Sequence, residues 1–300
     1  MKKTNLKAQG QGEDHASAPA QELGRHYFDL PYTLRADSKT LDIYLPEEGD
    51  APYPVVLFIH GRGFAAGNKR DGQLRRVLPL LSAGYAIASV EYSLSGEAKF
   101  PRQLIELKAA VRFLRAHALE YGLDPRHIIA SGCSAGGYLA SMLAVTAGRA
   151  EFDDLSLGYV RQSDDVQAVV AFYPGLDHSA IDGQFATRGV KREIPAVDEP
   201  GSYEERFFGS RLRVDPALAH AADPASYLGQ DTPPFWIIHG TADTCIPIEQ
   251  SISFMQKLRP IIGSRAHLTI LEGGDHGYDP RYGAPETISS ILSFLAVNLV

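Results

Sequence analysis

The chain has 300 residues, of which 44% are hydrophobic and 22% charged, a composition typical of a soluble globular protein. Its net charge of −7 and the lack of a basic stripe argue against a nucleic-acid partner. No apolar run approaches the ~20 residues that span a bilayer, and two cysteines cannot build a disulfide framework or a cysteine metal site.

The first segment, residues 1–22, is polar, aperiodic and rich in Gly, Ala and Gln, which predicts disorder. An early basic pair is not followed by an apolar h-region, so we expect no signal peptide. The protein is therefore expected to be cytoplasmic, with secretion as the alternative. Residues 23–300 are expected to form a single domain.

From residue 40 onward, short apolar runs alternate with segments of helical periodicity. The apolar runs predict strands at residues 40–46, 54–61, 85–92, 126–132, 166–174, 233–240 and 266–273. The periodic segments predict helices at about residues 101–122, 134–147, 248–258 and 286–299. Such alternation predicts a largely parallel α/β sheet with helices on both faces, where ligands bind beyond the carboxyl ends of the strands.

Residues 175–232 interrupt this alternation. The segment is rich in proline and in aromatic residues such as Phe185, Tyr203, Phe207 and Phe208. We expect an irregular excursion over the sheet, which forms a cap-like or pocket-walling insertion and not an independent domain.

A G-x-S-x-G pattern at residues 132–136 places Ser134 between a predicted strand and a predicted helix. The pattern alone is weak, because glycine and serine are common in this chain. Its position at a strand-to-helix joint is that of a nucleophile elbow, in which a strained turn exposes a serine hydroxyl beside a helix N-terminus. Ser134 is therefore the candidate nucleophile, and a plain glycine-rich turn is the alternative.

A serine hydroxyl needs a base that takes its proton and an acid that orients the base. His276 follows the last predicted strand in a Gly/Asp-rich loop, which places it at the same sheet edge as Ser134. Asp243, after the preceding strand, completes the order Ser, Asp, His that is found in α/β-hydrolases. Asp177 is the main competitor for the acid, and Asp275 is too close to His276 in sequence to orient its ring. The backbone N–H of Ala135 and those of the glycine-rich residues 60–64 are the candidate oxyanion donors.

With these residues in place, the chain resembles α/β-hydrolases of the carboxylesterase group that includes hormone-sensitive-lipase-like and bacterial feruloyl or acetyl-xylan esterase-like enzymes. The resemblance covers about residues 38–299 and rests on these stretches: LDIYLP, PVVLFIHGRGF, GYAIASVEYSLS, FPRQLIELKAAVRFLRAHALEYGLDPRHI, GCSAGGYLASMLA, PPFWIIHGTADTCIPIEQS and GGDHGY. It implies a mostly parallel eight-stranded sheet and no cofactor or metal. It also implies that Ser134, Asp243 and His276 form a catalytic triad. The backbone N–H groups of Arg62, Gly63 and Ala135 would form the oxyanion hole.

The chain departs from that family where a run of glycines is replaced by Gly61-Arg62-Gly63. A backbone N–H can still donate from an arginine, but its guanidinium now lies near the pocket mouth. One hypothesis is that Arg62 pairs with an anionic group of the substrate, with Phe64 as a second substrate-binding residue. A solvent-facing arginine is the alternative.

The sequence therefore predicts a serine hydrolase that cleaves carboxylic esters, with short acyl, aryl or carbohydrate esters suggested by the resemblance alone. A formamide or amide hydrolase of the kynurenine-formamidase type shares these motifs. A non-catalytic binding protein with the same fold is the third possibility. The expected partner is a small-molecule ester, and the expected assembly is a monomer or a homodimer.

Overall fold

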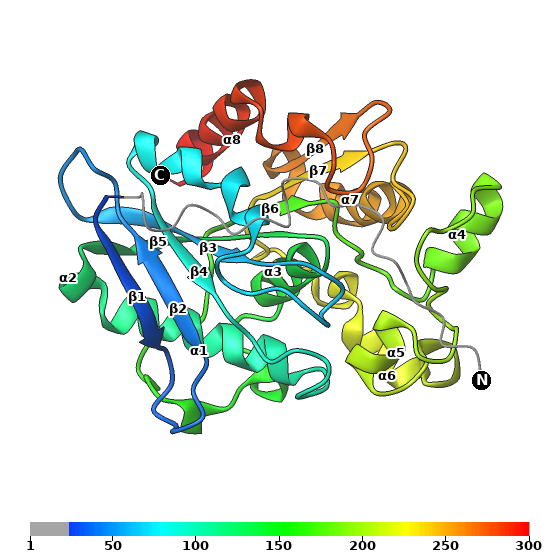
Figure 1. Ribbon diagram of the computed structural model, residues 1–300, viewed down its shortest axis with the longest axis horizontal. Coiled ribbons are helices and arrows are strands. Elements are labelled where there is room, and N and C mark those ends of the chain that lie inside the picture. The colour runs from blue at the N-terminus through cyan, green and yellow to red at the C-terminus, as the bar shows by residue number, and fades with distance from the viewer. Residues whose placement is uncertain (1–23, 300) are drawn as a thin grey trace.

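The computed structural model of the chain describes residues 24–299, so the disorder predicted for residues 1–22 lies outside the described residues (Figure 1). Within this range eight strands form one sheet in the order β1-β2-β4-β3-β5-β6-β7-β8. The strands are β1 (His26–Pro31), β2 (Thr40–Tyr44), β3 (Tyr53–Ile59), β4 (Ala86–Val90), β5 (Leu123–Cys133), β6 (Ala168–Phe172), β7 (Phe235–Gly240) and β8 (Ala266–Leu271).

The pairing directions confirm the predicted mostly parallel sheet. From β4 to β8 every neighbouring pair is parallel, and only β2 runs against its two neighbours in the described sheet. The carboxyl ends of β3, β5, β6, β7 and β8 therefore meet at one edge, where the loops that follow these strands come together.

β1 was not predicted from the sequence. It pairs with β2 at the border of the sheet, and its side chains are exposed or half-buried along its whole length. No apolar run marks such a strand, and Pro31 at its end is a residue that sheets accept only at borders or strand ends.

The four predicted helices fall close to their expected positions, and the segment 175–232 adds three short ones. The helices are α1 (Arg102–Ala116), α2 (Ala118–Tyr121), α3 (Ala135–Val145), α4 (Ile181–Arg188), α5 (Tyr203–Phe208), α6 (Pro216–Ala222), α7 (Glu249–Ile262) and α8 (Pro285–Asn298). The single helix predicted over residues 101–122 is divided at His117, and it ends at Gly122, which has the left-handed φ of 69°. None of the helices in residues 24–299 is long and apolar enough to cross a bilayer.

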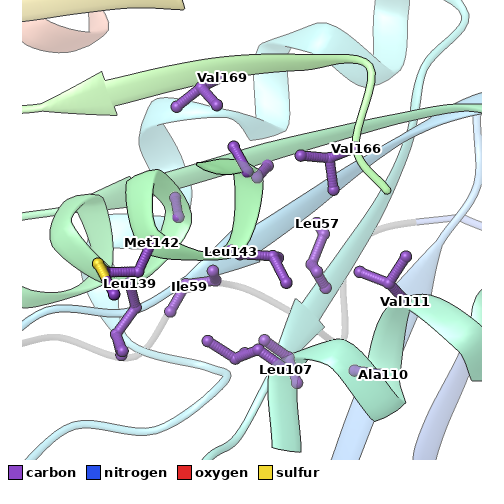
Figure 2. Packing of buried hydrophobic residues seen from close by; sticks show 14 of the residues in the cluster. Leu57, Ile59, Leu107, Ala110, Val111, Leu139, Met142, Leu143, Val166 and Val169 are labelled. Atoms are coloured by element: carbon purple, nitrogen blue, oxygen red, sulfur yellow. The ribbon is translucent and has the colours of Figure 1, made fainter. Parts of the chain in front are cut away.

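Two hydrophobic clusters cover the two faces of the sheet, because successive residues of a strand point to opposite sides. Val56 and Phe58 of β3 join the cluster under α8. The intervening residues of β3 join the larger cluster under α1 and α3. Figure 2 shows this larger cluster, with labelled side chains that include Leu57, Ile59, Leu107, Leu139 and Leu143. Complete burial of each such leucine stabilises the fold by about 1.5–3 kcal/mol, so the carboxyl ends of the central strands rest on a rigid base.

Residues 175–232 contain the short helices α4, α5 and α6, which lie together on the right-hand side of Figure 1. Phe207 and Phe208 of α5 are buried in the main cluster under α1 and α3. Ile181 and Phe185 of α4 form a small separate cluster with Ile246, which lies outside the segment. The segment thus packs its apolar side chains against the rest of the chain.

Candidate active site

Ser134 lies in a sharp turn between β5 and α3, with φ 53° and ψ −118°. A residue with a side chain adopts such a backbone only when its surroundings enforce it, at a cost of about 1–3 kcal/mol. Two backbone hydrogen bonds hold the turn: the Ser134 N–H donates to Phe172 O (2.9 Å), and the Tyr138 N–H donates to Ser134 O (3.0 Å). The geometry is that of the predicted nucleophile elbow.

The two glycines of the G-x-S-x-G pattern lie where backbones approach closely. A Cβ on Gly132 would lie 2.5 Å from the carbonyl of Gly136, and a Cβ on Gly136 would lie 2.0 Å from Ile59 O. Both distances are shorter than any tolerable contact. Glycine is required at these positions because α3 packs directly against the ends of β3 and β5.

His276, after β8, lies between Ser134 and Asp243. Its Nε2 is 2.9 Å from Ser134 Oγ, and its Nδ1 is 2.7 Å from Asp243 Oδ2. With the Nδ1 proton donated to Asp243, Nε2 is the nitrogen that can accept the serine proton. Residues 142 positions apart in the chain thus meet in one hydrogen-bonded line.

Asp243, after β7, is completely buried, and both of its oxygens have partners. Oδ1 accepts from the backbone N–H groups of Cys245 (2.9 Å) and Ile246 (2.7 Å). Burial alone would raise the pKa of the carboxyl, but His276 and the nearby His239 outweigh burial and hold this pKa well below its usual range. Asp243 is therefore a permanent carboxylate at neutral pH.

The two competing carboxylates face other partners. Asp177 accepts a hydrogen bond from the Ser179 hydroxyl (2.5 Å). Asp275 accepts from the backbone N–H of His276 (2.7 Å) and so fixes the loop rather than the ring. Of the three candidates, the structure brings Asp243 to the imidazole.

Two further histidines at strand ends, His60 and His239, take structural positions, as expected. His239 Nδ1 lies 2.6 Å from Ser251 Oγ, and its Nε2 lies 3.0 Å from Ile246 O and 3.3 Å from Asp243 Oδ2. His60 stacks on Tyr92 with ring centroids 4.4 Å apart. Burial lowers the pKa of His60 to about 4, so its ring is neutral.

The loop after β3 reaches the same place with an unusual backbone. Arg62, Gly63 and Phe64 have φ values of 72°, 60° and 60°, three consecutive left-handed residues. The side chain of Gln73 supports the start of this loop, because its Oε1 accepts from the Gly61 N–H (2.8 Å). The loop and the first residue of α3, Ala135, border the same cavity as Ser134.

The side chain of Arg62 forms an ion pair inside the protein. Its Nε and Nη2 both donate to the buried carboxylate of Asp71, the latter over 3.1 Å. This ion pair argues against a solvent-facing arginine and against pairing with a substrate anion, but Arg62 also lines the cavity, and its substrate role stays a prediction. Phe64 is buried by a stacked contact with Phe207, with centroids 3.7 Å apart, and it lines the cavity as predicted.

A cavity of about 440 Å³ opens beside Ser134 and His276. Several residues that the sequence did not single out also line it: Gln73, Tyr173, Gly175, His178, Ile194, Glu204, Cys245 and Tyr278. Cys245 and Tyr278 lie in stretches that carry the family resemblance, and the other six belong to no local motif. Their only shared signal is that most of them follow predicted strands or belong to the segment 175–232, which the sequence marked as a whole.

Hydrogen bonds connect residues 188–193 to the loop that carries Asp243. Arg188 donates to Thr241 O (2.6 Å), the Glu193 N–H donates to Thr244 O (2.9 Å), and Arg192 Nε donates to Cys245 O (3.0 Å). The start of the excursion and the loop after β7 therefore form one hydrogen-bonded unit.

Metal-ligand chemistry was considered for this site. Asp243, Cys245 and His276 place potential ligand atoms within 4.8 Å of one another in the described part of the chain. The Asp243 and His276 atoms are already hydrogen-bonded to each other, and burial raises the pKa of the Cys245 thiol to about 12. A protonated thiol is a poor ligand, so the donor set does not fit a metal ion.

Comparison with known proteins places this geometry in context. LipC, an esterase of Mycobacterium tuberculosis, is 29% identical over 78% of this chain and 55% of its own length, so the chain spans little more than half of that relative. A truncated carbohydrate esterase from gut microbiota superposes with a TM-score of 0.80 at 26% identity, over 94% of this chain and 99% of the other. Esterase 2 of Thermogutta terrifontis, phosphonylated by sarin, superposes with a TM-score of 0.71 at 26% identity, over 90% of this chain and 94% of the other.

The structural neighbours and the strand order confirm the α/β-hydrolase fold that the motifs implied. The family model described as BD-FAE matches residues 41–258, which include the loop after β3, the serine turn and Asp243. Because this match extends over far more than half of the chain, the protein belongs to the BD-FAE family.

Proposed function

We propose that the protein is a serine hydrolase that cleaves carboxylic esters through an acyl-enzyme, with Ser134 as nucleophile, His276 as base and Asp243 as the orienting acid. The observation that carries this proposal is the line from Ser134 Oγ to His276 Nε2 (2.9 Å) and from His276 Nδ1 to Asp243 Oδ2 (2.7 Å). A strained serine turn at the end of a central strand supports it, as does similarity to proteins named esterases.

In the first half-reaction, Ser134 Oγ forms a bond with the ester carbonyl carbon while its proton passes to His276 Nε2. The tetrahedral intermediate collapses, the bond to the alcohol oxygen breaks, and the alcohol leaves with the proton from Nε2. In the second half-reaction, water attacks the acyl group by the same route and releases the acid. Asp243 remains ionised throughout and stabilises the imidazolium.

The developing oxyanion is expected to be bound by backbone N–H groups of Ala135, Arg62 and Gly63. Ala135 is the first residue of α3, so its N–H points out of a helix N-terminus, where negative charge is favoured. Each such donor typically contributes about 10²–10³ in kcat. The three consecutive left-handed residues at 62–64 turn the loop after β3 toward the cavity.

We further propose that residues 175–232 are an insertion that walls the substrate pocket and belongs to the same domain. Four lining residues come from it beyond Gly175: His178, Ile194, Tyr203 and Glu204. Tyr203 lies directly over the loop after β3, because a Cβ on Gly63 would come within 2.8 Å of its ring. A cavity of about 440 Å³ suits a short acyl or an aryl ester, the classes that the resemblance suggested.

Covalent labelling tests the proposal. A fluorophosphonate probe is expected to label the wild-type protein and to leave Ser134→Ala unlabelled, and only the wild type should hydrolyse p-nitrophenyl acetate. Ser141→Ala is the matched control, since Ser141 lies on the same helix and its hydroxyl donates to Gly137 O (2.8 Å), within the helix itself. An unlabelled wild type, or labelling that survives in Ser134→Ala, would contradict the mechanism. A wild type that cleaves N-formyl substrates and not the acetate would favour the formamidase alternative.

A further inference from the structure

Two buried polar side chains of the segment 175–232 line the cavity and carry atoms that have no hydrogen-bond partner among the described residues. His178 is 5% exposed and Glu204 is 3% exposed. Within residues 24–299, the two ring nitrogens of His178 and the Oε2 atom of Glu204 have no hydrogen-bond partner. Each such buried atom costs about 1–3 kcal/mol when it is left without a partner. In a cavity, a bound ligand or water can supply the missing hydrogen bonds.

The charge of Glu204 is already balanced inside the protein. Arg192 Nη2 donates to Glu204 Oε1 over 2.7 Å, and its other nitrogens donate to the backbone oxygens of Cys245 and Pro195. Burial opposes ionisation, but His178 and Arg192 outweigh it and hold the pKa of Glu204 at about 2, so the group is a carboxylate and only accepts hydrogen bonds. The free oxygen therefore suits a neutral donor, because the carboxylate is already paired with a cation.

His178 offers a second hydrogen-bonding group beside Glu204. Its Nδ1 lies 3.8 Å from Glu204 Oε1, too far for a hydrogen bond between them. A ring nitrogen that carries a proton can donate a hydrogen bond, and a hydroxyl group can both donate and accept. A hydroxyl that donates to Glu204 Oε2 and accepts from His178 would satisfy atoms on both side chains.

Aromatic rings fix the position of the His178 imidazole. Its ring lies edge-on to Tyr138 (4.9 Å between centroids) and Phe208 (5.3 Å), and it is tilted against Phe64 (6.0 Å). Tyr138 lies one helical turn after Ser134, and Phe64 ends the loop after β3. The pair of polar side chains thus lines the same cavity as Ser134 and His276.

We propose that Glu204 and His178 form a hydroxyl-binding subsite that selects esters carrying a hydroxyl group close to the scissile carbonyl. This inference rests on the proposed ester hydrolase activity and adds the two residues that would select the substrate through a hydroxyl group, on either the alcohol part or the acyl part of the ester. Glu204 and His178 act on specificity and not on bond breaking.

The test compares matched esters that differ by hydroxyl groups. For the alcohol part, kcat/KM is measured for glycerol 1-acetate and for propyl acetate; for the acyl part, it is measured for methyl 3-hydroxybutyrate and for methyl butyrate. The wild type is expected to prefer the hydroxylated ester in at least one pair by about tenfold or more. The pair that shows the preference tells which part of the ester enters the subsite.

Two variants remove the subsite in different ways. His178→Leu replaces the ring with an apolar side chain in an aromatic pocket, so the fold loses no hydrogen bond within the described chain. Glu204→Gln keeps the shape, but Arg192 is donor-only, so the amide oxygen must face Arg192 and its NH₂ must face the cavity. Both variants are expected to reduce the preference at least tenfold. Ile194→Ala, an apolar change in the same cavity, should keep it.

The outcomes separate this inference from the proposed function. A wild type that hydrolyses the esters with no preference in either pair overturns the subsite and leaves the hydrolase intact. A preference that survives both His178→Leu and Glu204→Gln, or that Ile194→Ala abolishes equally, also overturns it. Failure of the wild type to hydrolyse p-nitrophenyl acetate or to react with the fluorophosphonate would instead contradict the hydrolase activity itself.

Discussion

Replacement of Gly136 by alanine gives a sharp test of how closely α3 packs on the sheet. The new Cβ would lie 2.0 Å from Ile59 O and 2.6 Å from His60 O, both of which are backbone atoms of a buried strand end. Relief to an ordinary contact of about 3.4 Å requires α3 and β3 to separate by more than 1 Å. Overpacking of this kind typically costs 1–3 kcal/mol, and we expect about 3 kcal/mol here because no flexible side chain can yield.

The same displacement would move the residues that follow Ile59, which form the loop at 61–64. A shift of about 1 Å in an active site can reduce the rate by about 10²-fold. Urea denaturation should show a lower midpoint for Gly136→Ala, and the initial rate on p-nitrophenyl acetate should fall about a hundredfold.

Gly183→Ala is the matched control. Gly183 lies in α4 with open space at its Cβ position, so alanine there should stabilise the protein by about 0.4–1 kcal/mol and leave the rate unchanged. If Gly136→Ala were as stable and as active as the wild type, the close approach of α3 to β3 would be refuted.

Three further changes follow from the site. Asp243→Asn should lower kcat by about 10³–10⁴ on p-nitrophenyl acetate with little change in KM, because an amide cannot hold the imidazole as a carboxylate does; a loss below tenfold would contradict its role. Arg62→Ala should reduce the free energy of unfolding in urea by about 1–3 kcal/mol, because Asp71 loses its partner. The same variant should not change the ratio of rates on anionic and neutral esters, and a changed ratio would restore a substrate role for Arg62. The folded protein lowers the pKa of Glu204 from 4.5 to about 2, which contributes up to about 3 kcal/mol of stability above pH 4.5 that is lost as the pH falls toward 2. The free energies of unfolding of the wild type and of Glu204→Gln, measured in urea, should therefore converge as the pH is lowered from 5 to 2. A constant difference between the two over this pH range would contradict the ionisation of Glu204.

The central sheet could be predicted because its strands are buried on both faces. Val55 to Ile59 of β3 form a continuous apolar run, and the same holds for β6 and β7. β1 could not be found in this way, because no side of it is fully buried and Asp29 stands in its middle. A strand that is buried on both faces is a continuous apolar run, and such a run can be recognised in the sequence.

Ser134 and His276 could be placed at one sheet edge because each follows a strand that the sequence reveals. The choice between Asp243 and Asp177 depended on the order of strands, which local patterns do not contain. His178 and Glu204 were missed for a related reason: they lie 26 positions apart in a segment without periodicity, and only the folded chain brings them together. The partner of the Arg62 side chain could not be predicted, because Asp71 lies in a turn that no motif marks.

The hydrogen bonds from Arg188, Arg192 and Glu193 to the loop after β7 limit how this enzyme scaffold can be re-engineered. A pocket wall that lacked these donors would leave residues 241–246, including the carboxylate that orients the imidazole, without this support. Grafts intended to alter selectivity must therefore carry both stretches together.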